Sequence, residues 1–222
     1  VVAIGGGTGL STMLKGLKLH THNITAVVTV ADDGGSSGIL RSDLGMLAPG
    51  DVRNCVSALA EVDPVMGELL NFRFKDGSLK GHSLGNLFLA ALNETSSSFD
   101  EAVKKFSHLA GVVGTVYPVT NESVTLSALL EDGRLIEGES HIGVHHDGPK
   151  NGIVKLMVNP EKPKAVDGVI KALEKADIIV LGPGSLYTSI IPNLLVDGVV
   201  DAIKKSNAVK IYVCNIMSQA GE

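Results

Sequence analysis

The chain has 222 residues, a length that suits one α/β domain with small insertions. Its net charge of −5 at pH 7 argues against a general nucleic-acid surface, because such a surface needs a basic face. Cys55 and Cys214 lie far apart without paired spacing, so neither a disulfide scaffold nor a zinc site is expected, and we expect a reducing, cytoplasmic location. No apolar run reaches the length of a membrane span.

The chain begins with the pattern of a strand, a glycine-rich turn and a helix. The apolar residues 1–4 lead into Gly5-Gly6-Gly7-Thr8-Gly9, and apolar residues at helical spacing follow. Glycine allows a phosphate to approach the backbone, and the following helix aims N–H groups and a positive dipole end at it. The dinucleotide fingerprint G-x-G-x-x-G fails at its third glycine, where Leu10 stands. We predict that Gly5, Gly6, Gly7, Thr8 and Gly9 bind a phosphate, with a purely structural turn as the alternative.

A second predicted strand, residues 24–30, ends in an acidic Gly/Ser loop at 31–38. Asp32 takes the place at which a Rossmann-type acidic residue meets ribose hydroxyls. Asp32 and Asp33 together are candidate Mg²⁺ ligands, because this ion prefers carboxylate and phosphate oxygens. Ser36 and Ser37 are candidate ligand contacts in the same loop. A solvated Asp-Gly turn is the alternative for the acidic pair.

Helical patterns dominate the stretch between the second and third core strands. We predict helices over 49–59, over 64–72, from about Ser83 to Leu92, and after Ser98, where a capping-box pattern occurs. In the first of these helices, Asp51 is a candidate helix cap, and Arg53 either grips a phosphate with its fork or holds that cap. Asn54 offers a donor and an acceptor to a ligand.

His82 and Asn86 are four residues apart, so that one helix face can present both. They are candidate ligand contacts, and a structural histidine is the equally weighted alternative.

The periodicity then changes to that of strands. We predict strands over 111–117, 123–130, 134–142 and 153–158, with a hairpin at Asp132-Gly133 and a loop over 143–152. His145 and His146 lie in that loop, and we expect them to be exposed and not to bind a metal, because no third ligand is spaced to close a site.

A second glycine turn follows the next helix and strand, residues 163–176 and 177–181. Gly182 and Gly184 allow close approach of a phosphate, while Ser185 and Tyr187 are candidate hydrogen-bond partners of a phosphate or base. We expect Pro192 and Asn193 to end a short helix there, a helix over 195–205, and a last buried strand at 210–214. The predicted fold is a Rossmann-like α/β parallel sheet with a helical insertion and an antiparallel β insertion.

Five motifs in order resemble one family: GGGTG at 5–9, DDGGSSG at 32–38, PGDVRN at 49–54, GHSLGNL at 81–87 and GPGSLYT at 182–188. This family unites 2-phospho-L-lactate transferase, of coenzyme F420 synthesis, with the bacterial YvcK-type gluconeogenesis factors. The second and third motifs look like the YvcK-type branch. That resemblance implies binding of a nucleotide sugar such as UDP-N-acetylglucosamine and a link to gluconeogenic growth and cell shape. The sequence leaves open whether the chain has a protein partner and whether it forms a homo-oligomer.

Three functions are compatible with these patterns. The first is a regulatory protein that binds a nucleotide sugar and needs no further cofactor, and the second is a Mg²⁺-dependent transferase of the phospholactate type. A nicotinamide-dependent oxidoreductase is the third, and the incomplete fingerprint weighs against it. No nucleophile–base pair is evident, so we assign no catalytic residue. We expect residues 1–222 to form a single nucleotide-binding domain that lacks its native C-terminal portion.

Overall fold

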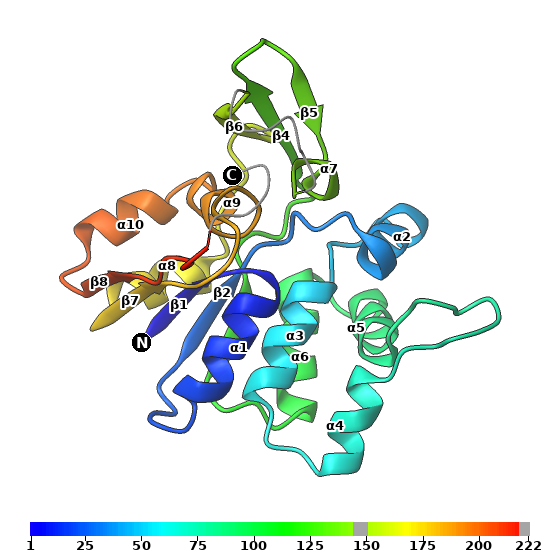
Figure 1. The fold of residues 1–222 in the computed structure, drawn as a ribbon. Helices are drawn as coiled ribbons and strands as arrows, with labels where there is room; N and C mark the ends of the chain where they lie inside the picture. The colour runs from blue at the N-terminus through cyan, green and yellow to red at the C-terminus, as the bar shows by residue number, and fades with distance from the viewer. Residues whose placement is uncertain (144–150, 218–222) are drawn as a thin grey trace.

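A parallel sheet of five strands forms the centre of the protein. The computed structural model describes residues 1–143 and 151–217 and orders the strands β3-β2-β1-β7-β8 (Figure 1). These strands are β1 (Val2–Gly5), β2 (Thr25–Val28), β3 (Thr115–Pro118), β7 (Ile178–Leu181) and β8 (Val209–Tyr212). Every pairing within this sheet is parallel, which confirms the predicted Rossmann-like α/β fold.

Helices cover both faces of the sheet because the buried strands carry apolar residues on both faces. Ala3 belongs to a core shared with α1 (Gly7–Leu17) and α3 (Gly50–Leu59). Ile4, which points to the opposite face, belongs to a second core with α8 (Asp167–Glu174) and α10 (Val199–Lys205).

The helical insertion lies beside α3 on the first face. It contains α4 (Pro64–Asn71), α5 (Leu84–Glu94) and α6 (Phe99–Leu109); in Figure 1, α4 and α5 lie towards the lower right and α6 lies behind α3. Ser83 accepts the backbone N–H of Asn86, and Ser98 accepts that of Glu101, so the predicted helix starts at these serines are confirmed.

The β insertion is an antiparallel sheet of three strands at the top of Figure 1, in the order β5-β4-β6. Its strands are β4 (Thr125–Leu130), β5 (Leu135–Glu137) and β6 (Ile153–Asn159). The predicted strand over 134–142 is correct only for β5, since α7 (Glu139–Gly143) follows directly. Gly138, at φ +100°, ends the strand, and the Asp33 carboxylate accepts the N–H groups of Glu139 and Ser140, both at 2.9 Å. A cap supplied by a residue 106 positions away decides the structure of this segment.

Two other predictions need correction. Residues 35–38 are not loop but the first turn of α2 (Gly35–Leu44), which begins after Gly34 in an extended conformation. The last strand is exposed, not buried: β8 forms an edge of the sheet in the described chain, and Val209 and Tyr212 are 62% and 48% exposed. Residues 144–150, with His145 and His146, lie outside the described residues. In the part that is described, no helix is both long and apolar enough to cross a membrane.

Candidate functional site

The two predicted glycine turns meet at the carboxyl ends of β1 and β7. The Gly182 N–H donates to the Ile4 carbonyl at 2.8 Å. A Cβ atom on Gly9 would lie 2.3 Å from the Pro183 carbonyl oxygen, and one on Gly6 would lie 2.5 Å from Thr29 Cγ2. Only glycine permits this approach. From β1 the strand order runs to β2 on one side and to β7 on the other, so this is the switch point at which α/β sheets bind ligands.

An open cleft of about 480 Å³ lies at this meeting point. Its lining combines the N-terminus of α1, the second glycine turn and the segment after β8, namely Gly9, Pro183, Gly184, Ser185, Asn215, Ile216 and Met217. The Asn215 side chain donates to the Gly184 carbonyl at 2.9 Å. Asn215 therefore ties the third wall of the cleft to the second turn.

The N-terminus of α1 points its backbone donors into this region. Gly7, Thr8 and Gly9 form the first turn of α1, and Gly6 supplies no side chain to cap them. Their N–H groups have no acceptor within the helix; Asp51 accepts that of Gly7, and Thr8 is exposed. This is the geometry that suits an anion such as a phosphate.

The other two candidates of the second turn have contacts of their own. The Ser185 hydroxyl accepts the Thr188 N–H at 3.1 Å and thereby caps the π-helical turn η1 (Leu186–Ile190). Tyr187 is partly buried and packs against the main hydrophobic core. Ser185 lines the cleft, whereas Tyr187 is not among the lining residues.

Acidic side chains from three segments gather beside the glycine turns. Asp51 lies in the first turn of α3, and its Oδ2 is 2.9 Å from where a Cβ on Gly6 would be. Burial, assisted by the charge of Asp32, raises the pKa of Asp51 to about 7, although the Gly7 N–H opposes this. Burial also raises the pKa of Glu139, with a hydrogen bond from Thr188 opposing and the charges of Asp32 and Asp33 adding to the rise. Asp51 therefore faces α1 and does not simply cap its own helix.

The two members of the predicted acidic pair have different surroundings. Both Asp33 oxygens accept N–H groups of α7, so this carboxylate holds the β insertion against the sheet. Asp32 Oδ1 accepts the Gly34 N–H at 2.9 Å, while Oδ2 accepts no hydrogen bond from a described residue. Within residues 1–143 and 151–217, no three His, Cys, Asp or Glu side chains are arranged to hold a metal ion. A Mg²⁺ ion at this pair stays a prediction, and Asp32 Oδ2 is the oxygen that is best placed for it.

Four predicted site residues form a separate, buried network between α2, α3 and α5. Arg53 Nε donates to Asn86 Oδ1 at 3.3 Å, and Asn86 Nδ2 donates to Ser36 Oγ at 3.1 Å. Ser36 Oγ lies 3.0 Å from His82 Nδ1. The side chains of Arg53 and Asp51 leave α3 on different sides. Arg53 and its network therefore face α5, whereas Asp51 faces α1.

The remaining candidates differ in position. Ser37 Oγ accepts the Gly50 N–H at 3.2 Å and joins the start of α3 to α2. Asn54 is partly exposed, and its side chain forms no hydrogen bond with the described residues.

The sequence analysis did not identify three residues that hold the site together. Asn193 lies inside α9 (Ile191–Leu194) and does not end the helix; its buried Nδ2 donates to the Gly5 and Ser189 carbonyls at 3.1 and 2.8 Å. Arg41 holds the acidic loop by donating to the Asp32 carbonyl at 3.1 Å, and it reaches the Val124 carbonyl at 2.8 Å. Glu139 is the third. None of these has a local sequence signal, since their partners lie far away along the chain.

Comparison with known proteins agrees with this architecture. The family described as "2-phospho-L-lactate transferase CofD" matches residues 1–222. The chain belongs to the CofD family. Within it, the chain is 49% identical over 225 residues to "Gluconeogenesis factor" of Halalkalibacterium halodurans and 47% identical over 225 residues to "Gluconeogenesis factor" of Bacillus subtilis. It covers 68% and 69% of these two relatives, each of which covers the whole chain.

A solved structure has the same fold. The crystal structure of protein BH3568 from Bacillus halodurans matches with a TM-score of 0.95 at 48% identity, over 100% of this chain and 70% of that one. A longer relative, from Clostridium acetobutylicum, is 55% identical over 222 residues, and the chain spans 49% of its length. These matches confirm the resemblance that the five motifs indicate.

We predict that Asp51 gives folding a specific pH dependence. Folded Asp51 keeps its proton up to about pH 7, whereas the unfolded group loses it near the ordinary aspartate pKa of 3.8, so the folded state binds more protons between these values. The free energy of unfolding should therefore fall as pH rises through this window, by at most about 1.4 kcal/mol per pH unit from this group. Asp51→Asn should remove that component in denaturant titrations between pH 4 and 8. Asp76→Asn, in an exposed loop, is the control, and a slope unchanged by Asp51→Asn would contradict the assignment.

We predict that Asp33→Ala destabilises the junction between the β insertion and the sheet. The variant leaves two backbone N–H groups of α7 without a charged acceptor, which should lower the free energy of unfolding by about 1–3 kcal/mol. Hydrogen exchange should also accelerate at the Glu139 and Ser140 amides. Asp43→Ala, an exposed aspartate of α2, serves as the control. Unchanged protection of the two amides would show that Asp33 does not hold α7.

Proposed function

We propose that this domain binds a nucleotide sugar such as UDP-N-acetylglucosamine and acts as the ligand-sensing part of a cytoplasmic gluconeogenesis factor. The observation that carries the proposal is the convergence of two glycine turns and the first turn of α1 at the switch point of the sheet. The names of the two Bacillus-type relatives supply the link to gluconeogenic growth. A role in cell shape is part of the same proposal and rests on the resemblance of the motifs alone.

The diphosphate of the ligand would lie at the N-terminus of α1. There the Thr8 and Gly9 N–H groups are the available donors, and the second turn is close enough to contact the same phosphates. The open cleft beside Gly184 and Met217 would take the rest of the ligand. Asp32 would accept hydrogen bonds from the ribose hydroxyls.

The carboxylates of Asp32, Asp51 and Glu139 beside the glycine turns affect how well the site can bind a negatively charged phosphate. Asp51 stands next to the turn that would hold the phosphates, so its ionised form would repel them. Protonation of Asp51 near pH 7, or a Mg²⁺ ion between the carboxylates and the phosphates, would relieve that repulsion. Binding should therefore strengthen when pH falls below 7 or when Mg²⁺ is added.

Regulation without turnover is the preferred form of the proposal. The hydrogen bond between Ser36 and His82 is the sole Ser–His pair among the side-chain bonds of the described chain, and it is buried away from the cleft. Ser36 also accepts a bond from Asn86, so its hydroxyl is committed to the network. Neither residue is placed to attack a ligand in the cleft.

A transferase of the phospholactate type is the second candidate. One observation favours it specifically: Asp51, with a pKa raised to about 7 beside the phosphate turn, has the properties of a general base. Incubating the protein with a lactyl-phosphate nucleotide donor, a deazaflavin acceptor and Mg²⁺, followed by mass spectrometry, tests it. Repeated turnovers that Asp51→Asn abolishes would favour the transferase over the sensor.

We predict that Thr8→Glu abolishes nucleotide binding without harming the fold. A carboxylate in the first turn of α1 is favourable for the helix by about 0.3–1 kcal/mol but repels a phosphate at the same place. Calorimetry with UDP-N-acetylglucosamine at pH 7 and saturating Mg²⁺ should show at least a tenfold loss of affinity, about 1.4 kcal/mol.

Thr12→Glu is the matched control, since Thr12 is exposed on α1 one turn further from the N-terminus. It should change affinity by less than about twofold, because the dipole effect falls off within the first turn. Equal binding by the wild-type protein and both variants would place the phosphates elsewhere.

A further inference from the structure

Arg53 is buried without an acidic partner. The residue is 7% exposed, and its guanidinium donates through Nε to Asn86 and through Nη1 to Asn71, the latter at 2.9 Å. Among the described residues, Nη2 has no acceptor and no carboxylate lies within ion-pair distance of Arg53. Buried arginines are normally paired with an acid. Two neutral amides fix the position of this guanidinium, and no carboxylate forms an ion pair with it.

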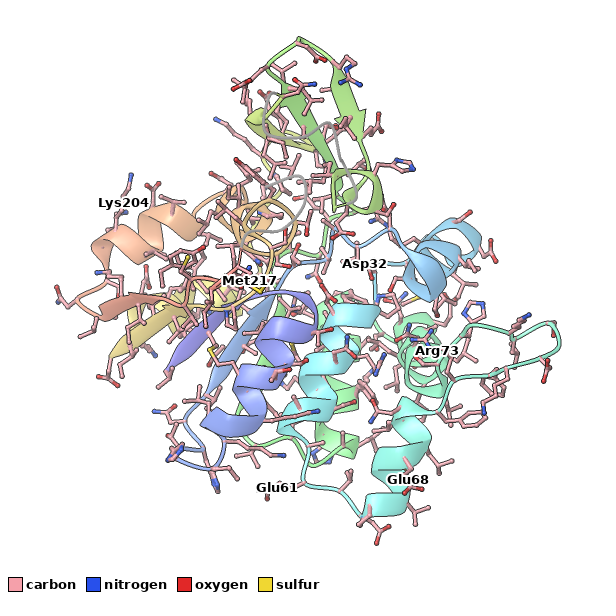
Figure 2. All side chains as sticks on the ribbon, in the orientation of Figure 1. Asp32, Glu61, Glu68, Arg73, Lys204 and Met217 are labelled. Carbon is pink, nitrogen blue, oxygen red and sulfur yellow. The ribbon has the colours of Figure 1, made fainter. Side chains whose placement is uncertain are left out.

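A second arginine adds to the positive charge at this place. Burial lowers the pKa of Arg53, the positive charge of Arg73 lowers it further, and Asp51 opposes both effects. Arg73 is exposed and donates to the Gly81 carbonyl, at the base of the loop that leads to His82. Figure 2 shows Arg73 on the α5 side of Asp32, away from Met217 and the cleft beside the glycine turns. The positive cluster is therefore separate from that cleft.

His82 contributes a third donor. Ser36 Oγ accepts a hydrogen bond from Asn86, and His82 Nδ1 is the acceptor within reach for the proton of this hydroxyl. If Nδ1 accepts, the imidazole carries its proton on Nε2. No described residue accepts a hydrogen bond from Nε2, so in this tautomer the Nε2–H group is available to a ligand.

The packing of α5 holds these donors in place. A Cβ atom on Gly85 would lie 3.0 Å from Arg53 Cγ and Cδ and 2.5 Å from the Leu70 carbonyl oxygen. The glycine thus lets α5 press against the stem of Arg53, while Asn86 from the next position fixes the head. Donors that are fixed before a ligand arrives lose little entropy when it binds.

We propose that Arg53, Arg73 and His82 form a second anion subsite, which takes a phosphate or carboxylate group of a small molecule and is distinct from the glycine turns. The Nη2 group of a guanidinium, a second arginine and an imidazole N–H are donor types that bind such oxyanions. The bound anion would supply the directly hydrogen-bonded negative partner that Arg53 lacks among the described residues. The subsite does not depend on which nucleotide occupies the turns.

Titration with inorganic phosphate, and separately with acetate, tests the subsite at constant ionic strength and in the presence of saturating UDP. The readouts are calorimetry and the ¹⁵N chemical shift of His82 Nε2. We expect saturable binding by the wild-type protein with a shift of the His82 signal. Arg73→Gln and Arg53→Gln should each weaken the affinity for the anion at least fivefold. A preference for phosphate or for acetate identifies which oxyanion the subsite takes.

Matched variants separate this proposal from the nucleotide site and from loss of fold. Lys80→Gln removes a positive charge from the same loop and should leave anion binding unchanged. Thr8→Glu, which disrupts the proposed nucleotide site, should also leave anion binding unchanged. Arg73 is exposed, so Arg73→Gln should fold even if Arg53→Gln does not. Absence of saturable binding of both anions, or binding that Arg73→Gln and Lys80→Gln affect equally, would overturn the subsite.

Discussion

The close approach of two backbones at the ends of β1 and β7 is the constraint on which the site depends. A side chain at Gly9 would collide with the Pro183 carbonyl, and one at Gly6 would collide with Thr29 and Asp51. Asn193 also holds the first glycine turn in position, because its side chain donates to the Gly5 carbonyl. Because the turns pack on each other directly, the N-terminus of α1 and the 182–185 turn face one cleft and can act on one ligand.

Charge is distributed unevenly along this edge of the sheet. Carboxylates from α3, the 31–38 segment and α7 lie next to the glycine turns, while Arg53, Arg73 and His82 lie beyond them towards α5. The helix α3 separates the two regions, since Asp51 and Arg53 leave it on different sides. The Asp33 carboxylate joins the acidic region to the β insertion through its hydrogen bonds to α7.

Local signals in the sequence predicted most of the fold. The alternation of glycine turns, apolar strands and helical spacing predicted the parallel sheet, and Ser83 and Ser98 marked helix starts because each needs only a donor three residues away. Residues 139–142 were wrongly predicted as part of a strand, because the cap that starts α7 comes from Asp33, far away along the chain. The strand β8 was predicted as buried because it is rich in apolar residues. Its sequence does not reveal whether another strand or helix covers those residues. At the site, the sequence named Ser36, Arg53, His82 and Asn86 but could not show that they form a network apart from the glycine turns.

The backbone amide signals of the two turns test the central claim most directly. A titration of the ¹⁵N-labelled protein with UDP-N-acetylglucosamine and Mg²⁺ should shift the amides of Thr8, Gly9 and Gly184 most strongly and along one common saturation curve. This result is expected because backbone N–H groups would contact the phosphates. Saturable shifts confined to other parts of the chain, with these three amides unchanged, would contradict the account.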